Sequence, residues 1–232
     1  MWNGKMKAVT FSLDDGVTQD IRAIEILNKY GLKATFNINS ELLGQENSLT
    51  ICEKKVPHNK VFPEQVKSIY AGHEVAVHTL THPRLTTLDE QEIIRQVEQD
   101  RKNLSELCGY EVIGMAYPCG GVNNDERVAK IIKENTGVKF SRTITANYQF
   151  DKQSYLYRFN PSIHFIDESI DYVIDRFLED KAETPQLFYI WGHAYEMDCD
   201  LFSWERFEKI CQKLSNKEDV FYGTNRQVLL GE

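Results

Sequence analysis

Two hydrophobic periods alternate along this chain of 232 residues. The runs 7–13 and 33–39 are short, apolar and rich in β-branched residues, which is the pattern of buried strands. Between them, residues 18–31 repeat their apolar positions at helical spacing. Thr18 suits the N-cap of this helix and Gly31 its C-terminal end. The first forty residues therefore predict a strand, a helix and a second strand.

The same alternation continues to residue 223. Further strands are predicted over 74–78, 111–118, 138–144, 156–165, 186–193 and 219–223. Further helices are predicted over 63–71, 88–109, 124–137, 169–180 and 203–216. Residues 40–62 are polar and irregular, so we expect them to leave the regular core.

Repeated strand–helix units imply a parallel sheet with helices outside it. Seven or eight strands in a chain of this length fit a closed or nearly closed (β/α) barrel of about seven parallel strands better than an open sheet. The chain has no internal repeat and no linker-like segment. We therefore expect an α/β fold in which residues 1–232 form a single domain.

The composition narrows the possible partners. A net charge of −8 without a basic run disfavours nucleic acid. The apolar runs are too short to span a membrane, and the N-terminus lacks the apolar segment of a signal peptide. Five scattered cysteines without a CxxC pair favour free thiols. The sequence thus predicts a cytoplasmic location.

Chemically active side chains gather at the ends of the predicted strands. They are Asp14 and Asp15, His78 and His82, the "YPCGG" turn at 117–121, and His193. Taken singly, each segment could have a purely structural role, since Asp-Asp-Gly is common in turns and a single histidine often only forms hydrogen bonds. In a parallel barrel, however, the carboxyl ends of the strands share the face on which active sites are built. Together the four segments predict an active site there.

The residue types at these strand ends suit a metal. His78 and His82 are four residues apart, which on a helical turn directs both imidazoles the same way. Catalytic zinc sites use three nitrogen or oxygen ligands and leave a position open. One of Asp14 and Asp15 completes this set, and the other is free to act as a base. His193 is the candidate acid for the leaving amine, and the ligand set also suits cobalt, nickel or iron.

Four of these segments resemble the motifs of a known family. "TFSLDDG", "HTLTH", "AYPCG" and "FYIWGH" are similar to motifs of the NodB-type polysaccharide deacetylases, the fourth carbohydrate esterase family. The resemblance implies a distorted barrel that hydrolyses N-acetyl or O-acetyl groups of a sugar, oligosaccharide or polysaccharide. It also implies roles for five residues: Asp14 as base, Asp15, His78 and His82 as ligands of a divalent metal, most simply Zn²⁺, and His193 as general acid.

The resemblance also points to residues that contact the substrate or its oxyanion. Tyr117 and Cys119 lie in the "YPCGG" turn, and the Cys119 amide is placed to stabilise an oxyanion. Many members carry an arginine where this chain has Ala116. We expect Arg142, at the end of the 138–144 strand, to supply that guanidinium instead. An Asp-Trp motif of many members is not recognisable, and His164, in roughly its place, either lines the site or packs elsewhere.

Aromatic residues near His193 have two interpretations. Trp191, Tyr195 and Trp204 either stack against a sugar or belong to the core.

Three functions remain possible from the sequence. The leading one is a metal-dependent hydrolase of an acetylated carbohydrate. Another is a hydrolase of a different small amide, such as a formamido sugar or a cyclic ureide. The third is an inactive carbohydrate-binding member of the family. The sequence leaves the sugar, the physiological metal and the oligomeric state open.

Overall fold

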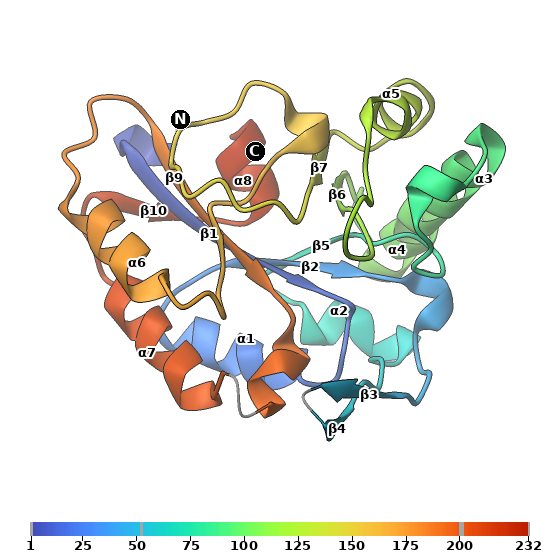
Figure 1. The fold of residues 1–232 in the computed structure, drawn as a ribbon, viewed down its shortest axis with the longest axis horizontal. Helices are drawn as coiled ribbons and strands as arrows, with labels where there is room; N and C mark the ends of the chain where they lie inside the picture. Colours follow the sequence, from blue (N-terminus) through green and yellow to red (C-terminus); the bar gives the residue numbers. More distant parts are fainter. Residues whose placement is uncertain (1, 52, 200–201, 232) are drawn as a thin grey trace.

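The computed structural model describes residues 2–51, 53–199 and 202–231, and in it strands alternate with helices (Figure 1). The strands are β1 (Lys7–Asp14), β2 (Ala34–Ile38), β3 (Ser48–Ile51), β4 (Lys54–Pro57), β5 (Glu74–Val77), β6 (Gly114–Ala116), β7 (Phe140–Arg142), β8 (Ile163–His164), β9 (Gln186–Gly192) and β10 (Val220–Tyr222). The α-helices are α1 (Asp20–Lys29), α2 (Val66–Ile69), α3 (Glu90–Ile94), α4 (Asp100–Cys108), α5 (Glu126–Asn135), α6 (Ile170–Glu179), α7 (Trp204–Leu214) and α8 (Asn225–Leu230).

The main sheet is parallel and strongly curved. Its strand order is β7-β6-β5-β2-β1-β9-β8, and β10 pairs with the first residues of β1. Phe159, shortly before β8, forms a parallel bridge with Arg142 in β7, so the two ends of the sheet approach each other. Figure 1 shows helices α1, α6 and α7 on one side and α3, α4 and α5 on another. The predicted distorted barrel of seven parallel strands is confirmed.

Burial explains why β1 reads as a continuous apolar run. All eight of its residues are buried, because β2 and β9 flank it and helices cover the sheet. Helix α7 turns its apolar stripe inward, and the ring of Phe207 lies 6.0 Å from that of Phe11 in β1. The Ser203 side chain accepts a hydrogen bond from the Arg206 amide and caps the start of this helix.

Three parts of the sequence prediction were wrong in detail. Residues 40–62 leave the main sheet as expected, but they are not irregular throughout, because they contain the antiparallel hairpin β3–β4. Of the predicted strand 156–165, only Ile163 and His164 pair with β9, because Pro161 has no amide to donate and residues 156–158 form a 3₁₀ turn. The predicted helix 88–109 contains a π turn, η5 (Arg95–Gln99), between α3 and α4.

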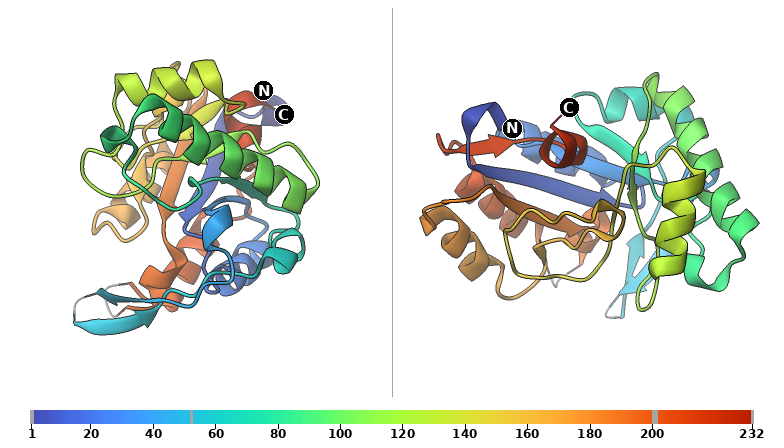
Figure 2. Two further views of the ribbon diagram at one scale, coloured as in Figure 1. Left: turned by 90° about the vertical axis from the view of Figure 1, so that its right-hand side faces the viewer. Right: turned by 90° about the horizontal axis from the view of Figure 1, so that it is seen from above.

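The β3–β4 hairpin projects from the barrel and is anchored at its base (Figure 2). The Thr18 amide donates to the Asn59 carbonyl at 2.8 Å, and the Val61 amide donates to the Gly16 carbonyl at 3.0 Å. The chain that follows β1 is therefore bonded directly to the segment that follows β4, at the base of the hairpin.

The described residues also bear on two expectations from composition. None of the helices in 2–51, 53–199 and 202–231 is both long and apolar enough to cross a bilayer. Within those ranges, Cys108, Cys119 and Cys211 form no disulfide. Cys52 lies outside the described residues.

Candidate active site

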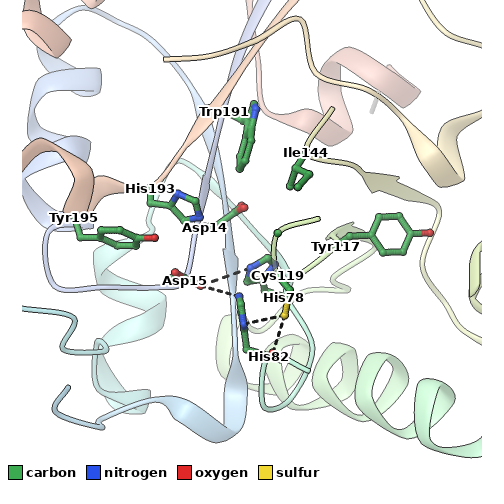
Figure 3. Close-up of a pocket in the computed structure, with 11 residues that line it drawn as sticks. Asp14, Asp15, His78, His82, Tyr117, Cys119, Ile144, Trp191, His193 and Tyr195 are labelled. Carbon is green, nitrogen blue, oxygen red and sulfur yellow. Dashed lines mark hydrogen bonds and ion pairs between the residues drawn. The ribbon is translucent and has the colours of Figure 1, made fainter. Parts of the chain in front are cut away.

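The strand ends that carry the candidate residues converge on one cavity of about 230 Å³ (Figure 3). Its lining residues are Asp14, Asp15, His78, His82, Tyr117, Cys119, Gly120, Ile144, Trp191, His193 and Tyr195. They come from the carboxyl ends of β1, β5, β6 and β9 and from the loop after β7. The barrel therefore brings together all four segments that the sequence singled out.

Asp15, His78 and His82 form a set of donors that fits a divalent metal. Asp15 Oδ1 lies 3.6 Å from His78 Nε2 and 3.4 Å from His82 Nε2, and the three donor atoms lie within 4.8 Å of one another. Metal–ligand bonds of about 2.0–2.2 Å in a tetrahedral site separate neighbouring ligand atoms by about 3.3–3.6 Å. His78 Nδ1 lies 2.9 Å from the Ala116 carbonyl, so it carries the proton and leaves the Nε2 lone pair directed at Asp15.

The "HTLTH" segment does not form the helical turn that its spacing suggested. Thr79 and His82 have positive φ angles of 69° and 61°, and the segment is a loop. Pro83 disfavours the right-handed α conformation at His82, so a helical turn cannot continue through this residue. The π turn holds the loop in place, since the Gln96 carbonyl accepts from the Leu80 amide at 3.0 Å. The two imidazoles therefore meet through a loop clamped to a helix.

The surroundings of Asp15 include two residues that sequence reasoning missed. His58 Nε2 lies 3.1 Å from Asp15 Oδ2, and Lys60 Nζ donates to the Asp15 carbonyl at 2.6 Å. Burial alone raises the pKa of Asp15, but His58 and Lys60 outweigh it and hold that pKa well below its usual range. Both lie in the 40–62 segment, where no periodic pattern marked them. Asp15 is thus kept ionised, as a ligand must be.

Asp14 faces a different set of partners. Arg142 Nη2 lies 2.5 Å from both carboxylate oxygens of Asp14, and Asn37 Nδ2 donates to Oδ1 at 2.8 Å. Burial raises the pKa of Asp14, but the guanidinium outweighs it and the pKa is lowered. Arg142 is itself buried, with its guanidinium carbon 4.5 Å from the centre of the Trp191 ring. The structure thus places a β7 arginine against the first aspartate, while Ala116 carries no charge.

His193 is paired with a carboxylate that the sequence did not reveal. His193 Nδ1 lies 3.3 Å from Glu196 Oε1, and Glu196 lies in the 3₁₀ turn η7 (Ala194–Asp198) directly after β9. Burial lowers the pKa of His193, but Glu196 and the two aspartates outweigh it and raise that pKa to about 9. The imidazole is therefore protonated at neutral pH.

His164 lies behind His193 rather than on the cavity wall. Its Nε2 lies 3.4 Å from Glu196 Oε2, and its Nδ1 accepts from the Ile166 amide at 3.2 Å. A neutral imidazole that accepts at Nδ1 carries its proton on Nε2, which then donates to Glu196. Although His164, His193 and Glu196 lie close enough to hold a metal, this tautomer makes His164 a hydrogen-bond donor instead of a ligand.

The remaining candidates divide between the cavity and the core. Trp191 and Tyr195 line the cavity. Trp204 is buried and donates to Asp198 Oδ1 at 2.8 Å, so of its two interpretations the structure favours the core. The Tyr117 ring points away from the cavity centre, and its hydroxyl donates to the Tyr157 carbonyl at 2.8 Å (Figure 3). Tyr117 still lines the cavity, but its hydroxyl is bonded to the backbone outside the cavity centre.

Cys119 sits at the cavity wall beside the second histidine. Its sulfur lies 3.7 Å from His82 Nδ1 and 3.4 Å from the His82 carbonyl. Its φ of 68° is unusual for a residue with a side chain and marks a sharp turn after Pro118.

Solved structures share this fold. The chain aligns over 96% of its length with 90% of a Bacillus subtilis peptidoglycan deacetylase PdaC mutant, at 18% identity and a TM-score of 0.56. It also aligns over 98% of its length with 89% of the Bc1960 peptidoglycan N-acetylglucosamine deacetylase, at 19% identity and a TM-score of 0.60. The chain therefore shares the barrel fold of these solved deacetylase structures.

Sequence comparison narrows this class. The polysaccharide deacetylase family model matches residues 3–139, and the chain belongs to that family. The putative polysaccharide deacetylase YxkH of Bacillus subtilis is 27% identical over 140 residues, which cover 59% of this chain and 44% of that protein. The peptidoglycan-N-acetylglucosamine deacetylase PgdA of Listeria monocytogenes is 25% identical over 119 residues, which cover 50% of this chain and 22% of that protein. The matches thus span less than half the length of either relative.

Proposed function

We propose that this protein is a metal-dependent hydrolase that removes an N-acetyl or O-acetyl group from a carbohydrate. One observation carries the proposal: the donor atoms of Asp15, His78 and His82 share a cavity with Asp14. The Asp14 carboxylate is paired with the Arg142 guanidinium, which favours its ionised form. Relatives named as peptidoglycan-N-acetylglucosamine deacetylases support the acetylated sugar as substrate. The donor set suits Zn²⁺, and also Co²⁺, Ni²⁺ or Fe²⁺.

A divalent cation held by these three residues supplies a Lewis acid that lowers the pKa of water and polarises an acyl carbonyl. Asp14 accepts the proton of the attacking water, since it is ionised and faces the same cavity. Arg142 and Asn37 fix the orientation of its carboxylate. The division of roles between adjacent aspartates follows from their partners, because Asp14 faces a guanidinium and Asp15 faces the histidines.

His193 protonates the leaving amine. The Glu196 carboxylate keeps the proton on the imidazole at neutral pH, so a donor is available when the carbon–nitrogen bond breaks. The Cys119 amide stabilises the oxyanion of the tetrahedral intermediate. Ile144 and the Trp191 ring give the cavity an apolar wall suited to the methyl group of an acetyl substituent.

Paired variants test this assignment. Asp14→Asn should abolish acetate release from N-acetylglucosamine oligomers while the protein still binds one equivalent of Zn²⁺. Asp15→Asn should lose both acetate release and affinity for the metal. Elemental analysis and an acetate assay, run beside a formate assay on formamido sugars, distinguish the acyl groups. Equal loss of metal in both variants, or a wild-type protein that binds no divalent metal, contradicts the proposal.

A further inference from the structure

The inner face of β1 carries a row of buried polar side chains behind the cavity. Alternate residues of a strand point to the same side, and Phe11 points outward, since its ring packs against Phe207 of helix α7. Thr10, Ser12 and Asp14 therefore face the interior of the barrel, and all three are buried. Ser12 is fully buried and does not line the cavity, so a substrate in the cavity does not reach its hydroxyl.

Two side chains connect Ser12 to Asp14. Asn37, in β2, has two hydrogens on Nδ2, which lies 2.9 Å from Ser12 Oγ and 2.8 Å from Asp14 Oδ1. Arg142, in β7, donates from Nε to Ser12 Oγ at 3.3 Å and from Nη2 to the Asp14 carboxylate. The same two donors thus hold the Ser12 hydroxyl and the Asp14 carboxylate, and the four side chains form a closed ring of hydrogen bonds.

The contact between Arg142 and Asp14 does not fix the guanidinium by itself. In a fork-to-fork pair two nitrogens meet two oxygens, but here Nη2 alone lies 2.5 Å from both carboxylate oxygens. A guanidinium held at one nitrogen can turn about that contact. Its plane is set by the bond from Nε to Ser12 and by the bond from Nη1 to the Thr143 carbonyl at 3.0 Å. Thr143 is the neighbour of Arg142 in the chain, whereas Ser12 belongs to the strand of Asp14.

The position of Ser12 in the fold suits it to hold this arrangement. It lies two residues before Asp14 in β1, which is paired with β2 on one side and β9 on the other. The extended backbone therefore sets the spacing between the hydroxyl and the carboxylate. Arg142, by contrast, reaches across the interior on a long side chain whose ordering costs conformational entropy. An acceptor on β1 fixes the guanidinium relative to the strand that carries the base.

We propose that Ser12 is a positioning residue for the base, and that its hydroxyl acts through Arg142 and Asn37 to keep the Asp14 carboxylate aimed at the cavity. The requirement follows from the origin of the guanidinium, which comes from β7, while Ala116 on β6 supplies no charge. This inference rests on the proposed function, since it takes Asp14 as the base for the attacking water.

Ser12→Ala tests the proposal with little change in volume. It leaves the Nε–H of Arg142 and one N–H of Asn37 without their acceptor, so the carboxylate should lose its fixed orientation. We expect kcat for acetate release from N-acetylglucosamine oligomers to fall by at least about tenfold, because a small displacement of a reacting group can cost about 100-fold. KM and the Zn²⁺ content should stay at their wild-type values, because Ser12 does not line the cavity. Ser12→Cys, whose thiol is only a weak acceptor, should have a kcat between those of Ser12→Ala and wild type.

Thr10→Val is the matched control. It removes a buried hydroxyl from the same face of β1, but that hydroxyl donates to Asn225 Oδ1 at 3.0 Å, away from Arg142 and Asn37. Thr10→Val should therefore lower the stability of the barrel much as Ser12→Ala does and yet keep the wild-type kcat. Equal losses of kcat in Thr10→Val and Ser12→Ala would mean that both act through the stability of the barrel, which overturns the proposal.

A measurement without turnover separates this inference from the proposed function. In protein labelled with ¹⁵N-arginine, the Nε–H signal of Arg142 is identified by its absence in Arg142→Lys. The signal should be present in wild type and in Thr10→Val, and it should be lost through exchange with water in Ser12→Ala. A signal that survives in Ser12→Ala, or a wild-type kcat in that variant, overturns the inference and leaves the deacetylase proposal intact. Loss of the signal in Ser12→Ala, together with a wild-type protein that releases no acetate, overturns the proposed function instead.

Discussion

At the scale of single residues, the Asp14–Arg142 pair decides whether the site has a usable base. Both side chains are buried, and Arg142 Nη2 lies 2.5 Å from each Asp14 oxygen. Removing one partner of a buried ion pair leaves the other charge uncompensated, at a cost of about 3–5 kcal/mol. Asp14 would then take up a proton or turn to another partner, and in either case it would be lost as a base.

Arg142→Gln should therefore lower kcat for acetate release by at least about 100-fold, with metal content unchanged. Arg142→Lys should recover part of the activity, since it restores the charge but not the planar guanidinium. Steady-state kinetics beside elemental analysis give the two readouts. Turnover by Arg142→Gln at the wild-type rate would show that Asp14 needs no guanidinium.

Glu196 controls the charge of the acid in the same way. His193 must be protonated to donate, so activity is present below its pKa and is lost as pH rises through about 9. Glu196→Gln removes the carboxylate that raises this pKa, so the alkaline limb of kcat/KM should move to lower pH by about one unit or more. Glu196→Asp should move it less. An unchanged alkaline limb in Glu196→Gln would assign that limb to another group.

The residues that the sequence predicted and those it missed differ in how they are positioned. Asp14, His78 and Arg142 could be found because each ends a strand or directly follows one, and parallel strand ends meet at one face. His58 and Lys60 follow the β3–β4 hairpin, and Glu196 lies in a short turn. Their partners are distant in sequence or depend on local loop geometry. No periodic pattern records which loop folds over which strand end.

At the scale of elements, the helix from α3 to α4 holds the metal-donor loop through its π turn. A π turn inserts one residue into a helix and often marks a functional site. Here it carries Gln96, whose Oε1 accepts from the Thr81 amide at 3.1 Å. Asp100, at the start of α4, accepts from the His78 amide at 3.2 Å. The loop keeps the positive φ angles of Thr79 and His82 because the neighbouring helix accepts hydrogen bonds from its backbone amides.

Gln96→Ala removes the side-chain clamp on this loop and should weaken Zn²⁺ binding by about tenfold, the lower range for residues behind metal ligands. Competition titration with a chelating dye measures the affinity. Gln99→Ala, in the same π turn but exposed and bonded to Asn103, is the matched control and should bind as wild type. Equal Zn²⁺ affinities in Gln96→Ala and Gln99→Ala would mean that the backbone contacts of the π turn hold the loop without the Gln96 side chain.

At the scale of the whole molecule, the barrel places several ionisable side chains in its interior. Asp20, at the start of α1, is fully buried, and Tyr70 donates to its Oδ2 at 2.8 Å. Its other oxygen is buried without a partner among the described residues. Burial raises the pKa of Asp20 to about 8, so the folded protein keeps this carboxyl neutral where the unfolded chain ionises it.

The sign of the resulting pH dependence follows from proton counts. Between about pH 4 and pH 8 the folded state holds a proton on Asp20 that the unfolded state has released. The contribution of Asp20 to the free energy of unfolding therefore falls as pH rises across this window. Asn is nearly isosteric with the neutral acid, keeps an acceptor for Tyr70 and does not titrate.

Asp20→Asn should consequently gain stability relative to wild type as pH rises, by at least about 2 kcal/mol between pH 5 and pH 8. Urea unfolding of both proteins at the two pH values gives this difference. Asp171→Asn, at an exposed site in the first turn of α6, is the control and should show little change with pH. If the difference between Asp20→Asn and wild type is the same at both pH values, Asp20 is ionised in the folded barrel, and the interior around Lys60 carries one more negative charge than this structure implies.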